Sequence, residues 1–188
     1  KQVISPLANP HMPYDANKLH RIKGGWSWRG ESTIARWYTM YATIIQLRSW
    51  LPDAIGGVEW LAMDNVATSI YVPFYGSATD MPEEYKVPGR VNGYTLKSAW
   101  WIFNRTGTLA AQRWGDMHKD VDSVWFPIQQ SMIDELPEID KQALELYKKD
   151  PAKAIEFMTE YSNKQGSMVM DKCIELGDFL WTKYDEKF

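Results

Sequence analysis

Three short β-rich runs constrain the fold of this chain more than any other feature of its sequence. They are Thr43–Arg48, Val58–Met63 and Ser69–Tyr75, and all three contain β-branched or aromatic residues. Turn signals made of proline, glycine, aspartate and asparagine separate them at residues 51–57 and 64–65. Proline presets φ, glycine supplies positive φ, and Asp and Asn bond to their own backbone, so these signals reverse the chain. The pattern predicts an antiparallel meander.

A further strand candidate precedes the meander, and the last strand of the meander contains a proline. Thr33–Tyr38 is also β-rich, so we expect a sheet of about four strands within residues 33–75. Pro73 gives no N–H to a strand ladder. The last strand is therefore expected at the edge of the sheet or at a bulge.

The strand Thr43–Arg48 has two different faces. Its odd-numbered members, Thr43, Ile45 and Leu47, lie on one face, which we expect to pack on a core. Its even-numbered members lie on the other face, which ends in Arg48 and is a candidate wall of a cleft.

From Thr95 onwards the chain has the period of helices. Apolar residues recur in steps of three and four, and Thr95 is the expected N-cap of the first helix. A second helix is expected from about Asp116, where Pro127 should kink or restart it. A third is expected from near Pro137 to Lys148-Lys149.

Two further start signals follow. Asp150-Pro151 combines an N-cap with a proline at the first helical position. Ser162 and Gln165 fit a capping box, which predicts a last helix from Asn163 to about Tyr184. The expected buried stripe of that helix is Val169, Cys173, Leu176 and Leu180.

The domain organisation follows from these patterns. Residues 1–32 hold three prolines and three glycines without an apolar period, which indicates an irregular leader. Residues 33–188 are assigned to a single α+β domain, in which the antiparallel sheet of residues 33–75 is covered by the helical layer of residues 95–188. A length of 188 residues suits one domain.

Composition excludes several classes of function. A net charge of −3 gives no basic surface, so we expect no nucleic-acid partner. No run approaches the about 18 apolar residues of a membrane span. The single cysteine, Cys173, is expected to be an inert core residue. His11, His20 and His118 have no partner at metal-ligand or triad spacing. We therefore assign no catalytic residue, metal or cofactor to this chain.

A glycine-framed loop at residues 24–30 holds Trp26 and Trp28. These tryptophans either plug the edge of the sheet or face a substrate. Arg36, in the first predicted strand, is a further candidate for substrate binding.

Arg48 ends an apolar strand just before a proline turn. An arginine there is costly to bury unless it meets an anion, and its planar fork of donors binds carboxylates bidentately. One interpretation is a salt bridge to Asp53 or Glu59; the other is a substrate carboxylate. The acidic stretch Asp134–Asp140 is expected to be a solvated helix start.

Motifs in both halves of the chain carry a resemblance to a known family. Those in the meander are Gln46-x-Arg48-x-x-Leu51-Pro52, Ile55-Gly56-Gly57-x-x-Trp60 and Tyr71-Val72-Pro73-Phe74-Tyr75. Those in the helical half include Ser98-Ala99-Trp100-Trp101-x-Phe103-Asn104 and Leu176-Gly177-Asp178-Phe179-Leu180. From about Ile22 onwards the chain resembles the dipeptidase A/secernin family of cysteine peptidases.

The resemblance implies a bacterial dipeptide hydrolase of the N-terminal-nucleophile superfamily, with an αββα sandwich fold. The nucleophile of that family is a cysteine that becomes residue 1 after processing, and its own α-amino group serves as the base. Here residue 1 is Lys1, and family members are much longer. We therefore expect this chain to be the C-terminal portion of such a dipeptidase, inactive by itself.

A sheet from half of a sandwich would have one unfinished face. We expect apolar side chains such as Val58, Trp60 or Ile70 to be exposed there, or buried by a second copy in a homo-oligomer. The alternative function is a non-catalytic, tryptophan-rich module that binds peptides or carbohydrates.

Overall fold

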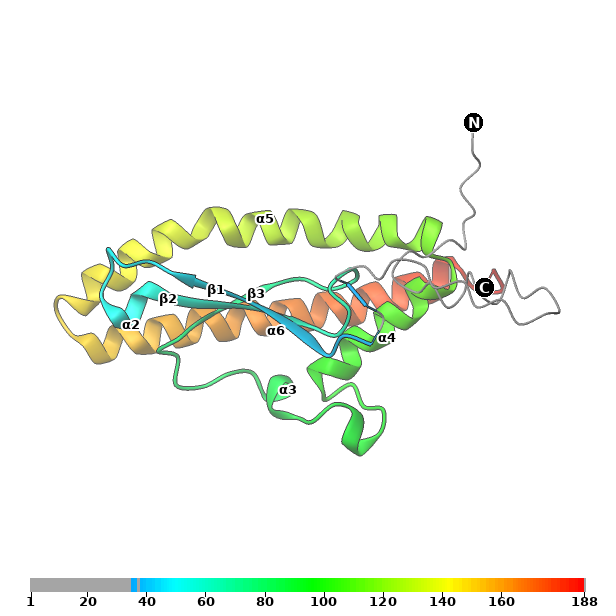
Figure 1. Ribbon diagram of the computed structural model, residues 1–188, viewed down its shortest axis with the longest axis horizontal. Helices are drawn as coiled ribbons and strands as arrows, with labels where there is room; N and C mark the ends of the chain where they lie inside the picture. The colour runs from blue at the N-terminus through cyan, green and yellow to red at the C-terminus, as the bar shows by residue number, and fades with distance from the viewer. Residues whose placement is uncertain (1–34, 37, 188) are drawn as a thin grey trace, which may run out of the picture.

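The computed structural model describes residues 35–36 and 38–187, and in them the chain is an α+β structure (Figure 1). Strands β1 (Tyr41–Leu47), β2 (Gly57–Met63) and β3 (Val72–Tyr75) form an antiparallel sheet in the order β1-β2-β3. The helices are α2 (Asp53–Gly56), α3 (Glu83–Lys86), the 3-10 turn η1 (Arg90–Asn92), α4 (Ala99–Gln112), α5 (Trp114–Tyr147) and α6 (Pro151–Lys183). The predicted fold class and the predicted meander are confirmed.

The described part of the sheet has three strands, where about four were predicted. Ala35, Arg36 and Tyr38 belong to the predicted strand Thr33–Tyr38 but are not in a strand. A turn bends the chain there, because Thr39 N donates to Arg36 O over 3.0 Å. The other residues of that run, and the predicted leader 1–32, lie outside the described residues.

The third strand begins later than predicted because the backbone groups of Tyr71 form hydrogen bonds with a side chain of α5 instead of with β2. Gln129 of α5 accepts a hydrogen bond from Tyr71 N (2.9 Å) and donates one to Tyr71 O (3.1 Å). Pairing with β2 starts only at Val72, which faces Leu61. β3 is an edge strand, as Pro73 predicted.

The long helix α5 replaces two predicted helices. It runs for 34 residues with Pro127 and Pro137 inside it, so neither proline starts a new helix. Buried side chains lie before Pro127 (Trp125), between the two prolines (Met132) and after Pro137 (Ala143). Packing of this face holds the helix together where proline removes a backbone hydrogen bond.

Helix α6 begins as predicted but does not restart. Asp150 Oδ1 accepts from Ala152 N over 3.0 Å, which caps the helix at Pro151. The capping box predicted at Ser162 is wrong, because α6 continues through it and Ser162 Oγ accepts from Tyr75 N (3.1 Å). The predicted buried stripe is confirmed, with Val169, Cys173, Leu176 and Leu180 at 0–3% exposure.

Helix α4 begins at Ala99, four residues after the predicted cap. Thr95 Oγ1 accepts from Lys97 N (3.2 Å), so it stabilises a turn before the helix instead of the helix itself. Ser98 occupies the N-cap position, but its hydroxyl donates to Val87 O (3.1 Å). The N-cap predicted at Thr95 is therefore wrong.

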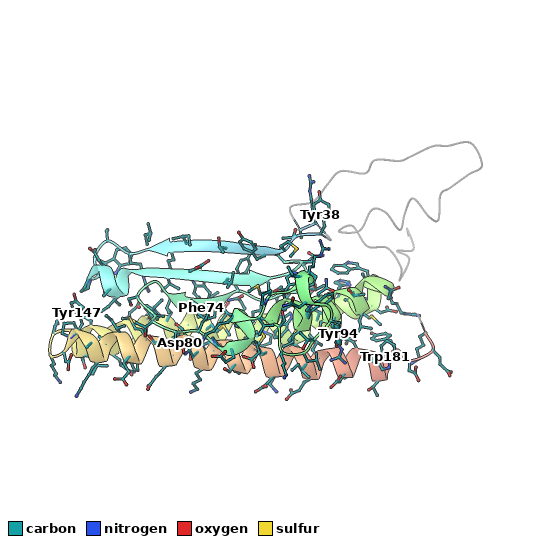
Figure 2. The ribbon with its side chains drawn as sticks, turned by 90° about the horizontal axis from the view of Figure 1, so that it is seen from below. Tyr38, Phe74, Asp80, Tyr94, Tyr147 and Trp181 are labelled. Carbon is teal, nitrogen blue, oxygen red and sulfur yellow. The ribbon has the colours of Figure 1, made fainter. Side chains whose placement is uncertain are left out.

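The helices cover the sheet unequally. α5 lies over one face, which holds Val58 and Trp60, and α6 runs along the β3 edge (Figures 1 and 2). The segment that holds α3 covers only the β3 end of the other face, where Tyr85 meets the Phe74 ring edge-on at 5.2 Å. Within the residues that the structure describes, no element lies beside the β1 edge.

Two expectations about the faces of the sheet are wrong. Thr43, Ile45 and Leu47 were expected in a core, but they lie on the face away from α5, and Leu47 is 77% exposed. Val58, Trp60 or Ile70 were expected to be exposed or to be covered by a second copy, but within this chain they are buried at 1%, 8% and 2%. The strands are apolar on both faces, so alternation alone did not identify the covered face.

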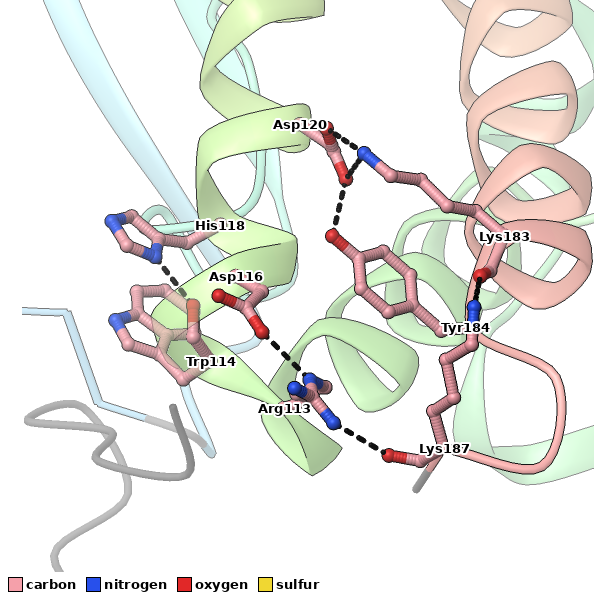
Figure 3. A network of polar contacts seen from close by, with 8 residues as sticks. All are labelled: Arg113, Trp114, Asp116, His118, Asp120, Lys183, Tyr184 and Lys187. Carbon is pink, nitrogen blue, oxygen red and sulfur yellow. Dashed lines mark hydrogen bonds and ion pairs between the residues drawn. The ribbon is translucent and has the colours of Figure 1, made fainter. Parts of the chain in front are cut away.

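A polar network fastens the end of α6 to the start of α5 (Figure 3). Asp120 accepts from Lys183 Nζ (2.7 Å) and from Tyr184 Oη (2.7 Å). Arg113 donates to Lys187 O over 3.1 Å. These contacts hold the two longest helices side by side.

Candidate functional site

A cleft of about 540 Å³ lies between the β1 end of the sheet and α5. The sheet side is formed by the end of β1, the turn that follows it and β2; α5 forms the opposite wall. Its lining combines a mostly apolar wall with a few polar groups. The lining residues are Gln46, Arg48, Trp50, Leu51, Trp60, Ile133, Leu136, Pro137, Asp140, Lys141 and Leu144.

Arg48 is the buried cation of the cleft, at 6% exposure. Its Nη2 donates to Ile55 O (2.8 Å), its Nε donates to Gly56 O (3.3 Å), and its Nη1 binds the carboxylate of Asp140. The guanidinium therefore ties the end of β1 to the short helix α2 and to α5. These contacts compensate the burial of its charge.

The salt-bridge partner of Arg48 is Asp140, not Asp53 or Glu59 as the sequence suggested. Asp140 lies 92 residues further along the chain, and its side chain is only 13% exposed. The expectation that Asp134–Asp140 is a solvated helix start is therefore wrong, because the whole stretch lies inside α5 and its last member is largely buried.

Asp140 also binds the last residue of β3. Tyr75 Oη donates to Asp140 Oδ1 over 2.6 Å, and the Tyr75 ring lies 5.8 Å from the Arg48 guanidinium carbon. Burial, followed by the bond to Asp140, raises the pKa of Tyr75 far above its ordinary value. The phenol stays neutral at physiological pH, so it serves as a hydrogen-bond donor.

The rest of the cleft offers an apolar surface with polar groups. Trp60 Nε1 donates to Gln46 Oε1 over 2.9 Å, which fixes the indole in the wall. Trp50 is 78% exposed, and the exposed Lys141 ammonium is 3.7 Å from Glu138. The arrangement can bind an apolar or aromatic group. Among the described residues that line the cleft, there is no cysteine, serine or threonine.

Of the four predicted substrate-binding residues, the structure describes Arg48 and Arg36, and only the first of these two lines the cleft. Arg36 is exposed, does not line the cleft and donates a hydrogen bond to Tyr38 Oη. Trp26 and Trp28 lie outside the described residues.

The single cysteine is a core residue, as predicted. Cys173 is 0% exposed; its Sγ is 3.5 Å from Thr106 Oγ1 and donates to Ile102 O at 3.6 Å. Burial raises the pKa of the Cys173 thiol to about 12, although the bond with Thr106 acts in the opposite direction. The thiol is therefore protonated at neutral pH and cannot be an activated nucleophile.

His118 offers no general base to the cleft. Its ring stacks on Trp114 at 5.3 Å and its Nδ1 contacts Trp114 O (Figure 3). His11 and His20 lie outside the described residues. Within residues 35–36 and 38–187, no group of three His, Cys, Asp or Glu side chains could hold a metal ion. No helix in that range has the length and apolarity to cross a membrane.

Sequence reasoning missed Asp140 and Tyr75. A signal for Asp140 was present, because Leu136 and Ala143 lie four residues before it and three after it and are buried at 4% and 0%. That spacing puts Asp140 on the buried face of the helix. Nothing local to Tyr75 indicates that its hydroxyl meets α5.

Comparison with known proteins adds two findings. A model of the family described as "Peptidase family C69" matches residues 9–126, which include the whole sheet and α4. A protein of Latilactobacillus sakei named "Probable dipeptidase" is 31% identical over 86 residues. That match covers 45% of this chain and 18% of the relative.

Proposed function

The chain belongs to peptidase family C69, and from that premise we propose that it is part of a dipeptidase. The proposal rests on one observation, which is that the family model matches the part of the chain that contains the whole sheet. The name of the relative, a probable dipeptidase, supports dipeptides as substrates. The match spans 18% of that relative, and we propose that the activity belongs to a longer protein of which this chain forms one part.

We propose that the nucleophile is a cysteine outside this sequence, with its own α-amino group as the base. The chain has one cysteine, Cys173, which is buried with a raised pKa. Attack on a peptide carbonyl needs a thiolate within reach of the substrate. Cys173 meets neither condition, so this chain alone should not hydrolyse dipeptides.

The cleft beside β1 is the proposed contribution of this chain to substrate binding. Its wall of Trp50 and Trp60 suits an apolar side chain. Arg48 shapes that wall, since three of its five N–H groups are engaged by the protein. The roles in substrate binding predicted for Trp26, Trp28 and Arg36 remain proposals.

A panel of dipeptides tests the proposal. The full-length protein, expressed from its open reading frame, should release free amino acids from several dipeptides, and this chain alone should release none. The Cys173→Ala variant of the full-length protein should retain its activity, because the thiol is in the core. Turnover by this chain alone that disappears in Cys173→Ala would overturn the proposal. Peptide or sugar binding by a full-length protein without turnover would support a non-catalytic module instead.

A further inference from the structure

The two edges of the sheet are built differently. The β3 edge carries Pro73, and α6 runs alongside it. The β1 edge holds no proline and no charged residue, since its sequence is Tyr-Ala-Thr-Ile-Ile-Gln-Leu. Natural edge strands are normally protected by charges, proline, bulges or a covering element. β1 has the composition of an interior strand.

Two hydrogen bonds establish which backbone groups of β1 point away from β2. Arg48 N donates to Gly56 O and Asp64 N donates to Met40 O, each over 2.9 Å. Bonded and non-bonded pairs alternate along an antiparallel ladder. The even-numbered residues of β1 therefore bond to β2, and the odd-numbered residues point their N–H and C=O outwards. The outward-pointing residues are Tyr41, Thr43, Ile45 and Leu47.

The side chains of β1 are exposed on both faces. Ile45 and Leu47 on one face are 59% and 77% exposed, and Ile44 on the other is 53% exposed. A strand that is apolar on both faces is typical of a sheet covered on both sides and continued on both edges. In the part of the chain that the structure describes, nothing covers these side chains and no hydrogen bond reaches the outward backbone groups.

We propose that β1 is an interior strand of a larger sheet, and that its missing neighbour is a strand from a part of the same protein outside this sequence. The relative supports that source, because 82% of it lies outside the match to this chain. The new strand would carry apolar side chains that point alternately to the two faces of the sheet. The side chains on the α5 face would close the open side of the cleft. The inference rests on the proposed function in one respect: it assumes that the protein is longer than this sequence. Its test does not measure activity, so the two proposals can fail separately.

Two proline variants separate an interior strand from an edge strand. Thr43→Pro removes an N–H that points outwards, and Ile44→Pro removes one that bonds to β2. In this chain alone, Thr43→Pro should lower the melting temperature by no more than about 4 °C, and Ile44→Pro by clearly more. In the full-length protein both variants should cause the larger loss, and a full-length Thr43→Pro protein that fails to fold supports the proposal equally. If the full-length protein tolerates Thr43→Pro as well as this chain does, β1 is an edge there and the proposal is wrong.

Hydrogen exchange gives a second measurement on the unaltered protein. The amides of residues 41, 43, 45 and 47 should exchange fast in this chain and slowly in the full-length protein. Equal, fast exchange in both would overturn the proposal. Light scattering tests the source of the strand. If the full-length protein forms a dimer that Ile45→Lys converts to a monomer, a second copy covers the edge instead, and the proposed source is wrong.

Discussion

At the scale of the residue, Asp64 combines burial with a left-handed backbone conformation. It is 4% exposed with φ at 60°, and Asn104 Nδ2 donates to its Oδ1 over 3.1 Å. Burial raises the pKa of the Asp64 carboxyl, although the bond from Asn104 acts against that change. Because the folded pKa is raised, this group contributes stability below the unfolded pKa of 3.8 and loses it as the pH rises through the folded pKa.

Asp64→Asn should therefore raise the melting temperature at pH 7, since it removes a buried charge and asparagine tolerates positive φ. The difference from the unaltered protein should shrink as the pH falls towards 4, where the carboxyl becomes neutral. Thermal melts of both proteins between pH 4 and pH 8 measure it. The exposed Asp171→Asn is the matched control. A variant less stable than the unaltered protein at pH 7 would show that Asp64 is needed as an anion.

A variant of Arg48 can distinguish a structural role in the cleft wall from direct binding of the substrate. Lysine keeps the charge near Asp140 but cannot reach Ile55 O and Gly56 O at the same time. In the full-length protein, Arg48→Lys should lower the free energy of unfolding by about 1–3 kcal/mol, while kcat/KM per folded molecule changes less than about threefold, roughly 0.7 kcal/mol. Denaturant unfolding and dipeptide kinetics check both values, with the exposed Arg36→Lys as control. A tenfold loss of kcat/KM at unchanged stability would instead make Arg48 a ligand of the substrate carboxylate.

The need of Arg48 for an anion could be predicted from sequence, but the identity of that anion could not. The charge and the apolar strand are local, whereas Asp140 is 92 residues away. Only the packing of α5 against the sheet brings the two together.

At the scale of the element, α6 shows which local signals decide a helix boundary. Asp150-Pro151 starts the helix because the first N–H groups of α6 have no helical carbonyl before them, so the Asp150 side chain accepts their hydrogen bonds. Ser162 has an equally good local signal, but the two side chains of its capping box make tertiary hydrogen bonds instead of capping a helix. Ser162 Oγ accepts from Tyr75 N, and Gln165 Nε2 donates to Glu135 over 2.6 Å. Such contacts cannot be predicted from a four-residue pattern.

The contact between α6 and the segment after β3 depends on Gly166. A Cβ there would lie 2.8 Å from Pro82 Cγ and 3.4 Å from Phe74 Cζ. Gly166→Ala should destabilise the protein by about 1–3 kcal/mol, because this overpacking outweighs the gain of about 1 kcal/mol in helix propensity. Urea unfolding measures it, with the exposed Ser167→Ala in the same helix as control. An alanine variant of unchanged or higher stability would show that the proline ring moves aside.

At the scale of the whole molecule, two long helices support a small sheet, and no other described element pairs with its β1 edge (Figure 1). The α+β class could be predicted because the periodicity of the chain changes once, from strands to helices. The covered face of the sheet could not be predicted, because β2 is apolar on both faces except at Glu59. The candidate cleft was predicted only as far as its Arg48 wall, since α5 forms the opposite wall.

The most direct test of the central claim is to locate the reactive cysteine. The full-length protein is treated with iodoacetamide until dipeptide hydrolysis stops, and mass spectrometry then identifies the labelled residue. The label should lie on a cysteine outside this sequence, and Cys173 should stay unlabelled because its thiol is buried with a raised pKa. Stoichiometric label on Cys173 that parallels the loss of activity would contradict the account.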